Sequence, residues 1–232
     1  MNEEKNLTTE ETFALAVKNH EKSNFKNAEI LYRKILNINP DHFGAISLLG
    51  TLSAQTKNFD LAKQLLQKAI QINPQHPEAH YNLGLVFNEL VDFEKAITYY
   101  EKAIEIKPNY ADAYNNLGRI YTELGDFQKA RNCYEQAIKS QPGNLGYFYA
   151  LSHFKKEILN PNLRNSIEKI INDNNCIKKN MAFGNFLLSR YESKEKNYEK
   201  EIDYLIKGHA YYFEFKKEKF TRQLKYWFDF LP

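Results

Sequence analysis

The chain has 232 residues, of which 43% are hydrophobic, so it can bury a sizeable core and is not expected to be disordered. Its 32 Lys and Arg nearly balance its 29 Asp and Glu, which argues against a nucleic-acid-binding protein. The two cysteines cannot build a disulfide framework, and no apolar run approaches the roughly 18 residues that a membrane-spanning helix needs. We therefore expect a cytoplasmic protein that binds neither nucleic acid nor a membrane.

The first eight residues are polar and have no apolar stretch behind them, so they predict an N-terminal tail (1–8) rather than a signal peptide. Thr8 and Glu11 have the spacing of a capping box, in which each side chain bonds the backbone N–H of the other residue. This pair predicts that the first helix begins at residue 9.

A 34-residue period dominates the chain from there to residue 142. It is carried by three columns of identical residues: Pro40, Pro74, Pro108 and Pro142; Phe25, Phe59, Phe93 and Phe127; Ala28, Ala62, Ala96 and Ala130. A period of 34 with helical spacing inside it is typical of a helix-turn-helix repeat. We predict four repeats over residues 9–142, with bounds 9–42, 43–76, 77–110 and 111–144.

Each repeat contains signals for where its second helix begins and ends. A polar residue followed by phenylalanine, as in Asp92-Phe93, predicts an N-cap and an aromatic ring that packs into the core. The proline that follows predicts the end of the helix, because proline has no N–H to donate. Small residues predict close helix contacts, and we expect Gly84 to face Ala96.

The third and fourth copies match a known consensus in many columns. The matching residues are His80, Leu83, Gly84, Phe87, Ala96, Tyr100, Ala103 and Pro108, and then Tyr114, Leu117, Gly118, Tyr121, Ala130, Tyr134, Ala137 and Pro142. This pattern resembles the tetratricopeptide repeat. The resemblance implies an all-α fold, a right-handed superhelix of antiparallel helix pairs, in which the first helices line the concave face.

Beyond residue 144 the repeat pattern weakens, and residues 145–232 predict an irregular helical region that caps the array. Residues 145–157 begin like another first helix, but Ser152-His153-Phe154-Lys155 leaves the pattern. Asn160-Pro161 predicts the start of a short helix. Residues 181–213 predict one degenerate repeat-like pair, and the stretch from residue 209 to 231 predicts one long helix or two short ones.

Part of this region is similar to the linker of bacterial TPR-sulfotransferases, on the basis of Phe183 to Tyr191, Asn197-Tyr198 and Lys207-Gly208-His209. In that family a sulfotransferase domain follows the linker and begins with a phosphate-binding loop. That loop is not in this sequence, so no catalytic or cofactor residue is carried over. If such a domain follows, we expect it to pack on the aromatic cluster Tyr226, Trp227 and Phe228.

No catalytic, cofactor-binding or metal-binding constellation is visible in the sequence, so we expect a non-enzyme without a cofactor. His76 and His80 are four residues apart, but Pro77 lies between them at a repeat boundary, which argues against a shared metal site. Cys133 and Cys176 lack the spacing of a redox or metal motif.

The resemblance leaves a binding surface as the functional feature. The residues expected on the concave face of the third and fourth repeats are Tyr81, Asn82, Leu85, Asn88, Asn115, Asn116, Arg119 and Thr122. Amide side chains donate and accept hydrogen bonds, which suits the backbone of an extended peptide. Glu78, Glu89, Asp112 and Glu123 are expected at the rim, which favours neutral or basic segments. We predict a non-catalytic protein-interaction scaffold; the alternative is the substrate-recruiting region of a TPR-sulfotransferase.

Overall fold

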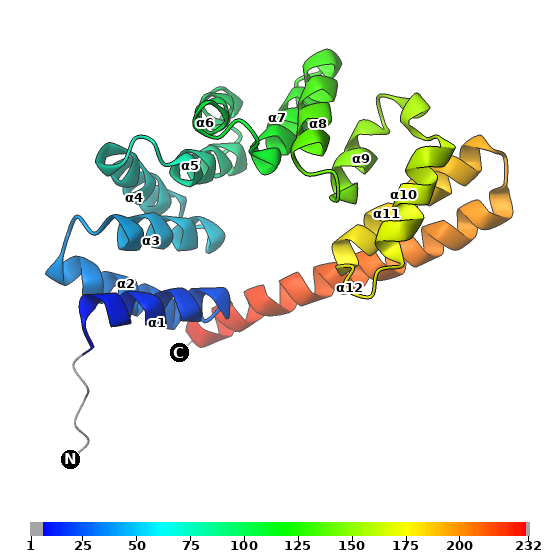
Figure 1. The fold of residues 1–232 in the computed structure, drawn as a ribbon. Coiled ribbons are helices and arrows are strands. Elements are labelled where there is room, and N and C mark those ends of the chain that lie inside the picture. The colour runs from blue at the N-terminus through cyan, green and yellow to red at the C-terminus, as the bar shows by residue number, and fades with distance from the viewer. Residues whose placement is uncertain (1–6, 231–232) are drawn as a thin grey trace. The chain divides into compact units, whose positions relative to one another are not determined.

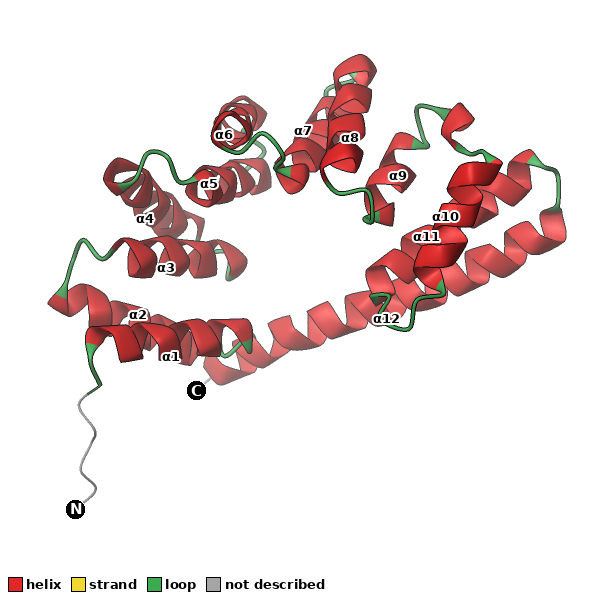
Figure 2. Cartoon of the chain, viewed as in Figure 1, coloured by secondary structure: helices red, strands yellow, loops and turns green. Residues whose placement is uncertain are grey.

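The computed structural model describes residues 7–230, and the side chains of all of them except Lys156 and residues 218–230. Within this range the chain is all-α, as predicted, with twelve α-helices, one short 3-10 helix (Lys156–Ile158) and no strand (Figures 1 and 2). The first eight helices are α1 (Thr9–Glu21), α2 (Phe25–Ile38), α3 (Phe43–Gln55), α4 (Phe59–Ile72), α5 (Pro77–Glu89), α6 (Phe93–Ile106), α7 (Ala111–Glu123) and α8 (Phe127–Ser140). The last four are α9 (Leu145–Leu151), α10 (Pro161–Ile171), α11 (Lys178–Lys194) and α12 (Tyr198–Phe230).

The helices belong to two compact units. Among the described residues, the first comprises 7–108 with 222–230, and the second comprises 109–221. Helices α1 to α6 lie in the first unit and form three pairs, each a 13-residue helix followed by a 14-residue helix. In the second unit, α7 pairs with α8, and α9 to α11 follow. The helix bounds agree with the predicted 34-residue period.

The predicted N-caps of the second helices are present in three repeats of four. Asn58, Asp92 and Asp126 accept hydrogen bonds from backbone N–H groups three residues on, at 3.4, 3.2 and 3.1 Å. Asn24 makes no such bond; its Nδ2 donates to Oδ1 of Asn19 at 2.9 Å. The prediction that the following ring packs into the core is wrong at Phe127, whose side chain is 57% exposed.

The turn inside each pair uses one residue with positive φ. These residues are Ser23, Lys57, Val91, Gly125 and Lys196, with φ between 59° and 78°. At each turn the next backbone N–H bonds a carbonyl five residues back, for example Asp92 N to Phe87 O at 2.9 Å. This is the helix-ending geometry that glycine favours. Because Lys196 shares it, the turn between α11 and α12 has the geometry of the repeat turns.

Val91 is the least suitable residue for this conformation, because a branched Cβ crowds the backbone when φ is positive. We expect Val91→Gly to stabilise the chain by about 1 kcal/mol, since the exposed valine contributes little packing and left-handed backbone costs about 1–2 kcal/mol in non-glycine residues. The reverse change at the equivalent turn, Gly125→Val, should destabilise by a similar amount. Urea unfolding of the two variants measures both effects, and a Val91→Gly midpoint below that of the parent would contradict this assignment.

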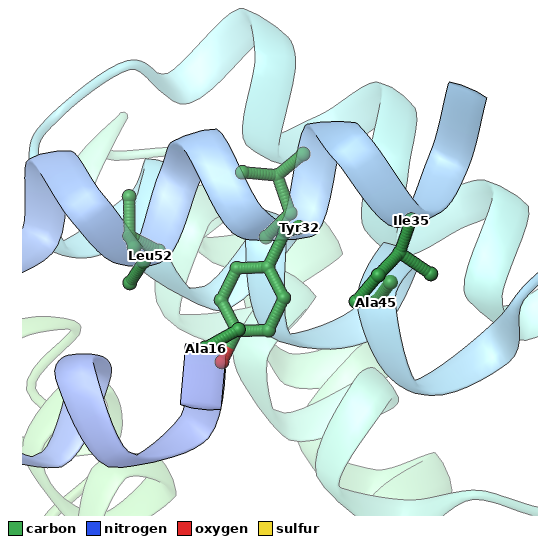
Figure 3. Packing of buried hydrophobic residues seen from close by; sticks show 7 residues of the cluster. Ala16, Tyr32, Ile35, Ala45 and Leu52 are labelled. Atoms are coloured by element: carbon green, nitrogen blue, oxygen red, sulfur yellow. The ribbon is translucent and has the colours of Figure 1, made fainter. Parts of the chain in front are cut away.

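The core of the first unit alternates small and large side chains. Figure 3 shows Tyr32 and Ile35 of α2 lying near Ala16 of α1 and Ala45 and Leu52 of α3, and each is 1% exposed or less. The side chain nearest to Gly84 is Tyr100, and the predicted contact of Gly84 with Ala96 stays a prediction. A Cβ at Gly84 would lie 2.7 Å from the ring of Tyr100, one turn beyond Ala96, because the tyrosine ring occupies the gap that glycine leaves.

The helices of the second unit partly follow the predictions for residues 145–232. Asn160 caps α10 as expected, accepting from Leu163 N at 3.0 Å. Helix α11 packs on α9 and α10, and its residues Leu187 and Leu188 are fully buried. The degenerate pair does not end near residue 213, because α12 continues unbroken to Phe230. No helix in the described range is long and apolar enough to cross a membrane.

Candidate functional site

The eight residues predicted for the binding surface divide between the two units. Tyr81, Asn82, Leu85 and Asn88 lie on α5, and all four are half-buried. Asn115, Asn116, Arg119 and Thr122 lie on α7 of the second unit.

The α5 set is joined to α3 by a chain of hydrogen bonds. Nδ2 of Asn82 donates to the hydroxyl of Thr51 at 2.9 Å, and that hydroxyl donates to the carbonyl of Ser47 at 2.9 Å. An amide has two N–H groups and an oxygen with two lone pairs, so one bond orients the Asn82 side chain and leaves further hydrogen-bonding capacity. Helices α3 and α5 thus carry polar groups side by side on one face of the first unit.

A second polar connection joins α1 and α3. Nε2 of His20 lies 3.0 Å from Oε1 of Gln55, and Nδ1 lies 3.3 Å from the hydroxyl of Tyr32. Because an amide oxygen only accepts, Nε2 carries the proton and Nδ1 accepts from Tyr32. Burial lowers the pKa of His20, against the opposing effects of Gln55 and Glu21, and burial raises the pKa of Tyr32 to about 12.

This network predicts a loss of stability in mild acid. A histidine whose pKa is lower in the folded state binds more protons when unfolded, so the free energy of unfolding rises with pH up to the unfolded value of about 6.5. We expect the urea midpoint to fall as the pH is lowered from 7.5 through 6.5 to 5. In His20→Gln the fall should be smaller but not absent, because partial burial of the imidazole and the charge of Arg190 also lower the pKa of His153 in the second unit. An identical pH profile in both proteins would contradict the assignment.

The α7 set differs in how accessible its members are. Asn116 is only 8% exposed, so it contributes little surface. The hydroxyl of Thr122 donates to Gly118 O at 2.7 Å and lies 3.4 Å from the hydroxyl of Tyr134. Arg119 is exposed and is the basic side chain of this helix, whose acidic residues Asp112 and Glu123 are exposed as well.

The predicted acidic rim is partly neutralised. Glu78 lies 3.4 Å from Nζ of Lys107. Asp112 accepts a hydrogen bond from the hydroxyl of Tyr147 at 2.7 Å. The carboxylates of Glu78 and Asp112 therefore have partners within the protein, which weakens the predicted preference for basic ligands.

The structure also reveals a group of residues that the sequence reading missed. An aromatic–basic cluster is formed by Tyr149, His153, Phe183, Phe186 and Arg190, from α9, the turn after it, and α11. The ring of Tyr149 lies 5.0 Å from that of His153 and 5.4 Å from that of Phe183, and the guanidinium of Arg190 lies 5.8 Å from the Tyr149 ring. His153 is exposed, and Tyr149 and Arg190 are half-buried, so this cluster is accessible.

A sequence signal for the cluster exists in retrospect. Ser152 and Ser189 are almost fully buried and each follows a buried leucine, as Gly118 follows Leu117. Serine is also a small residue and occupies the glycine position of the repeat here. The repeat pattern therefore still holds at Ser152, where the sequence prediction had ended it. By this spacing His153 and Arg190 take the place that Arg119 has on α7.

The histidines at the repeat boundaries have structural roles. Nδ1 of His42 and of His76 accepts from the N–H of Ala45 and Ala79, at 3.1 and 3.2 Å, so both residues are helix N-caps. Nε2 of His80 lies 2.9 Å from the carbonyl of Pro74. No group of three or more potential metal ligands occurs among the residues that the structure describes.

The family model described as "Tetratricopeptide repeat" matches residues 41–109 and, in an overlapping second match, 78–142. No curated protein sequence matches the chain. The matched residues run from α3 to α8, and the columns of the first predicted repeat lie outside them.

Solved structures with a similar fold include two crystal structures of MamA. One is 25% identical and matches with a TM-score of 0.58 over 82% of this chain and 95% of that one. Another is 22% identical, with a TM-score of 0.54 over 88% of this chain and 96% of that one. A mutant O-GlcNAc transferase of Thermobaculum terrenum is 27% identical and matches with a TM-score of 0.54, over 60% of this chain but only 27% of that one. These matches support the arrangement of successive helix pairs.

Proposed function

Residues 41–142 of this chain are tetratricopeptide repeats, and we propose that the protein is an interaction scaffold that holds an extended peptide on the face made by its first helices. In the first unit this face comprises α1, α3 and α5. The observation that carries the proposal is the hydrogen bond from Asn82 to Thr51, because it holds a half-buried amide of α5 against α3 on that face.

The chemistry of this face suits a peptide backbone. Asn82, Asn88 and Thr51 are half-buried and polar, and Tyr81 and Leu85 are half-buried beside them on α5. Amides can bond the N–H and C=O groups of an extended segment whatever its side chains, while the tyrosine and leucine offer apolar contact. Each such hydrogen bond contributes about 0.5–1.5 kcal/mol net, so affinity depends on several of them together.

The second unit would favour a different ligand charge. Arg119, His153 and Arg190 occupy equivalent positions of α7, the turn after α9, and α11. The two arginines carry the positive charge, because the pKa of His153 is lowered, and Tyr149 lies beside His153 and Arg190. Positive charge beside aromatic rings favours acidic segments. We infer that a ligand of the second unit carries carboxylates, whereas the first unit selects for backbone and apolar contacts.

A random peptide library displayed on phage tests the proposal. We expect selection against the full chain to yield peptides that bind in calorimetry, and Asn82→Ala/Asn88→Ala to weaken a selected peptide of the first unit by about tenfold, which is 1.4 kcal/mol. Asn37→Ala, an exposed amide on the second helix α2, is the matched control and should leave binding unchanged. Failure to select any peptide, or equal effects of the two amide changes, would contradict the proposal.

The alternative, a substrate-recruiting region followed by a sulfotransferase domain, stays a prediction. The linker-like residues Phe183 to Tyr191 lie in α11, where Phe186, Leu187 and Leu188 are buried, so packing accounts for them. The side chains of Tyr226, Trp227 and Phe228 lie outside the described part of the chain. A reading frame that continues beyond Pro232 into a phosphate-binding loop would favour this alternative.

A further inference from the structure

Helix α12 exposes a stripe of large apolar side chains. Tyr198, Ile202, Ile206 and Phe213 are 63%, 56%, 63% and 69% exposed. At 100° per residue these four positions fall within 80° of one another around the helix axis, so they form one narrow face. We call this face the α12 stripe. Single exposed apolar residues are common, but four on one helix face mark an interaction surface.

The stripe is distinct from the face by which α12 packs on its own unit. Gly208 is buried against the ring of Phe186 on α11, and Tyr204 packs on the core cluster around Leu187. These inward positions lie on the opposite side of the helix from the centre of the stripe. The spacing from Ile202 through Ile206 and His209 to Phe213 is four, three and four residues, the spacing of a coiled-coil seam.

The charges that flank the stripe change sign along the helix. Glu199, Glu201 and Asp203 border its N-terminal half, and Lys216 and Lys217 border its C-terminal end. All five are exposed or half-buried. A parallel copy of the helix would place like charges together, whereas a reversed copy places the acidic half opposite the basic half. With Ile202 opposite Phe213 of a reversed copy, Glu199 lies opposite Lys216.

We propose that α12 pairs with α12 of a second copy of this chain, antiparallel, through the α12 stripe. The stripe between residues 198 and 217 is about 30 Å long at 1.5 Å per residue, which is nearly three heptads. We infer that the partner is a second copy of this chain and not another protein. The acidic half of the α12 stripe matches the basic end of the same stripe in a reversed copy, so the surface is complementary to itself.

Sedimentation velocity of the full chain, from about 1 to 100 μM in about 150 mM salt, tests this pairing. We expect a concentration-dependent dimer, and Ile206→Asp/Phe213→Asp should raise the dissociation constant at least a hundredfold while the helical circular dichroism stays unchanged. Both residues point away from the unit's core, so the variant should remain folded. Ile30→Asp, at a 56% exposed isoleucine on α2, is the matched control and should leave the dimer intact.

Charge reversal tests the orientation. Glu199→Lys/Asp203→Lys should weaken the dimer at least tenfold, and adding Lys216→Glu/Lys217→Glu in the same chain should restore it, because reversal of both halves recreates the match. A parent chain that stays monomeric at 100 μM, a dimer that survives Ile206→Asp/Phe213→Asp, or a fourfold variant that fails to regain affinity would overturn the proposal.

Discussion

Gly84→Leu is expected to lower the free energy of unfolding by about 2–3 kcal/mol, within the range measured for overpacked cores. The reason is steric: a Cβ at this position would lie 2.7 Å from two ring carbons of Tyr100, closer than carbon atoms approach in folded proteins. Tyr100 is fully buried, so its ring has no open space to move into. Helices α5 and α6 must separate to admit the side chain.

Thermal unfolding followed by circular dichroism measures this effect, with an expected fall in Tm of about 5–10 °C. Gly143→Leu is the matched control, because nothing lies within 4 Å of a Cβ there. It should change Tm by no more than about 1–2 °C, as surface substitutions do. Equal Tm values for the two variants would show that Gly84 is not a close-contact position.

Arg164→Met is expected to destabilise the second unit by about 3 kcal/mol or more. Nη2 of Arg164 lies 3.0 Å from Oε1 of Glu192, whose side chain is only 2% exposed. That oxygen has no hydrogen-bond partner among the described residues, so the ion pair with Arg164 compensates its burial. Removing one member of a buried pair leaves an uncompensated charge, which typically costs 3–5 kcal/mol.

The double variant Arg164→Met/Glu192→Leu should recover most of that loss, because apolar residues of similar volume can replace a buried ion pair. Arg33→Met is the matched control: its partner Glu29 is 24% exposed, and such helix pairs contribute about 0.3–0.5 kcal/mol. Urea unfolding of the four proteins measures these differences. If Arg164→Met costs no more than Arg33→Met, Glu192 does not depend on the pair.

The repeats were predictable because their signals are local and repeated. Proline ends a helix and a capping residue begins one whatever lies around them, so the 34-residue period and the starts of the second helices followed from the sequence. The turn at Val91 was also within reach, since Gly125 occupies the same position of the next repeat with the same backbone conformation. A residue type that recurs at the same position of several repeats indicates a structural role, which the sequence of one helix pair alone would not reveal.

Other features depend on contacts that a periodic pattern does not contain. Which side chain fills the space beside Gly84 depends on how far the Tyr100 ring reaches across the helix pair. The aromatic–basic cluster joins Tyr149 to Arg190, 41 residues away, through the packing of α9 on α11. Its helices are separated by α10, an insertion that breaks the 34-residue spacing, so equivalent positions were not recognised.

Photo-crosslinking is the most direct measurement of where a peptide binds. A library-selected peptide that binds the first unit, carrying one benzophenone residue, is irradiated with the full chain and the adduct is located by mass spectrometry. We expect the adduct on α3 or α5, at residues next to Asn82 and Thr51, and its loss in Asn82→Ala/Asn88→Ala. An adduct on the second helices α2, α4 or α6 would contradict the claim that the first helices form the binding face.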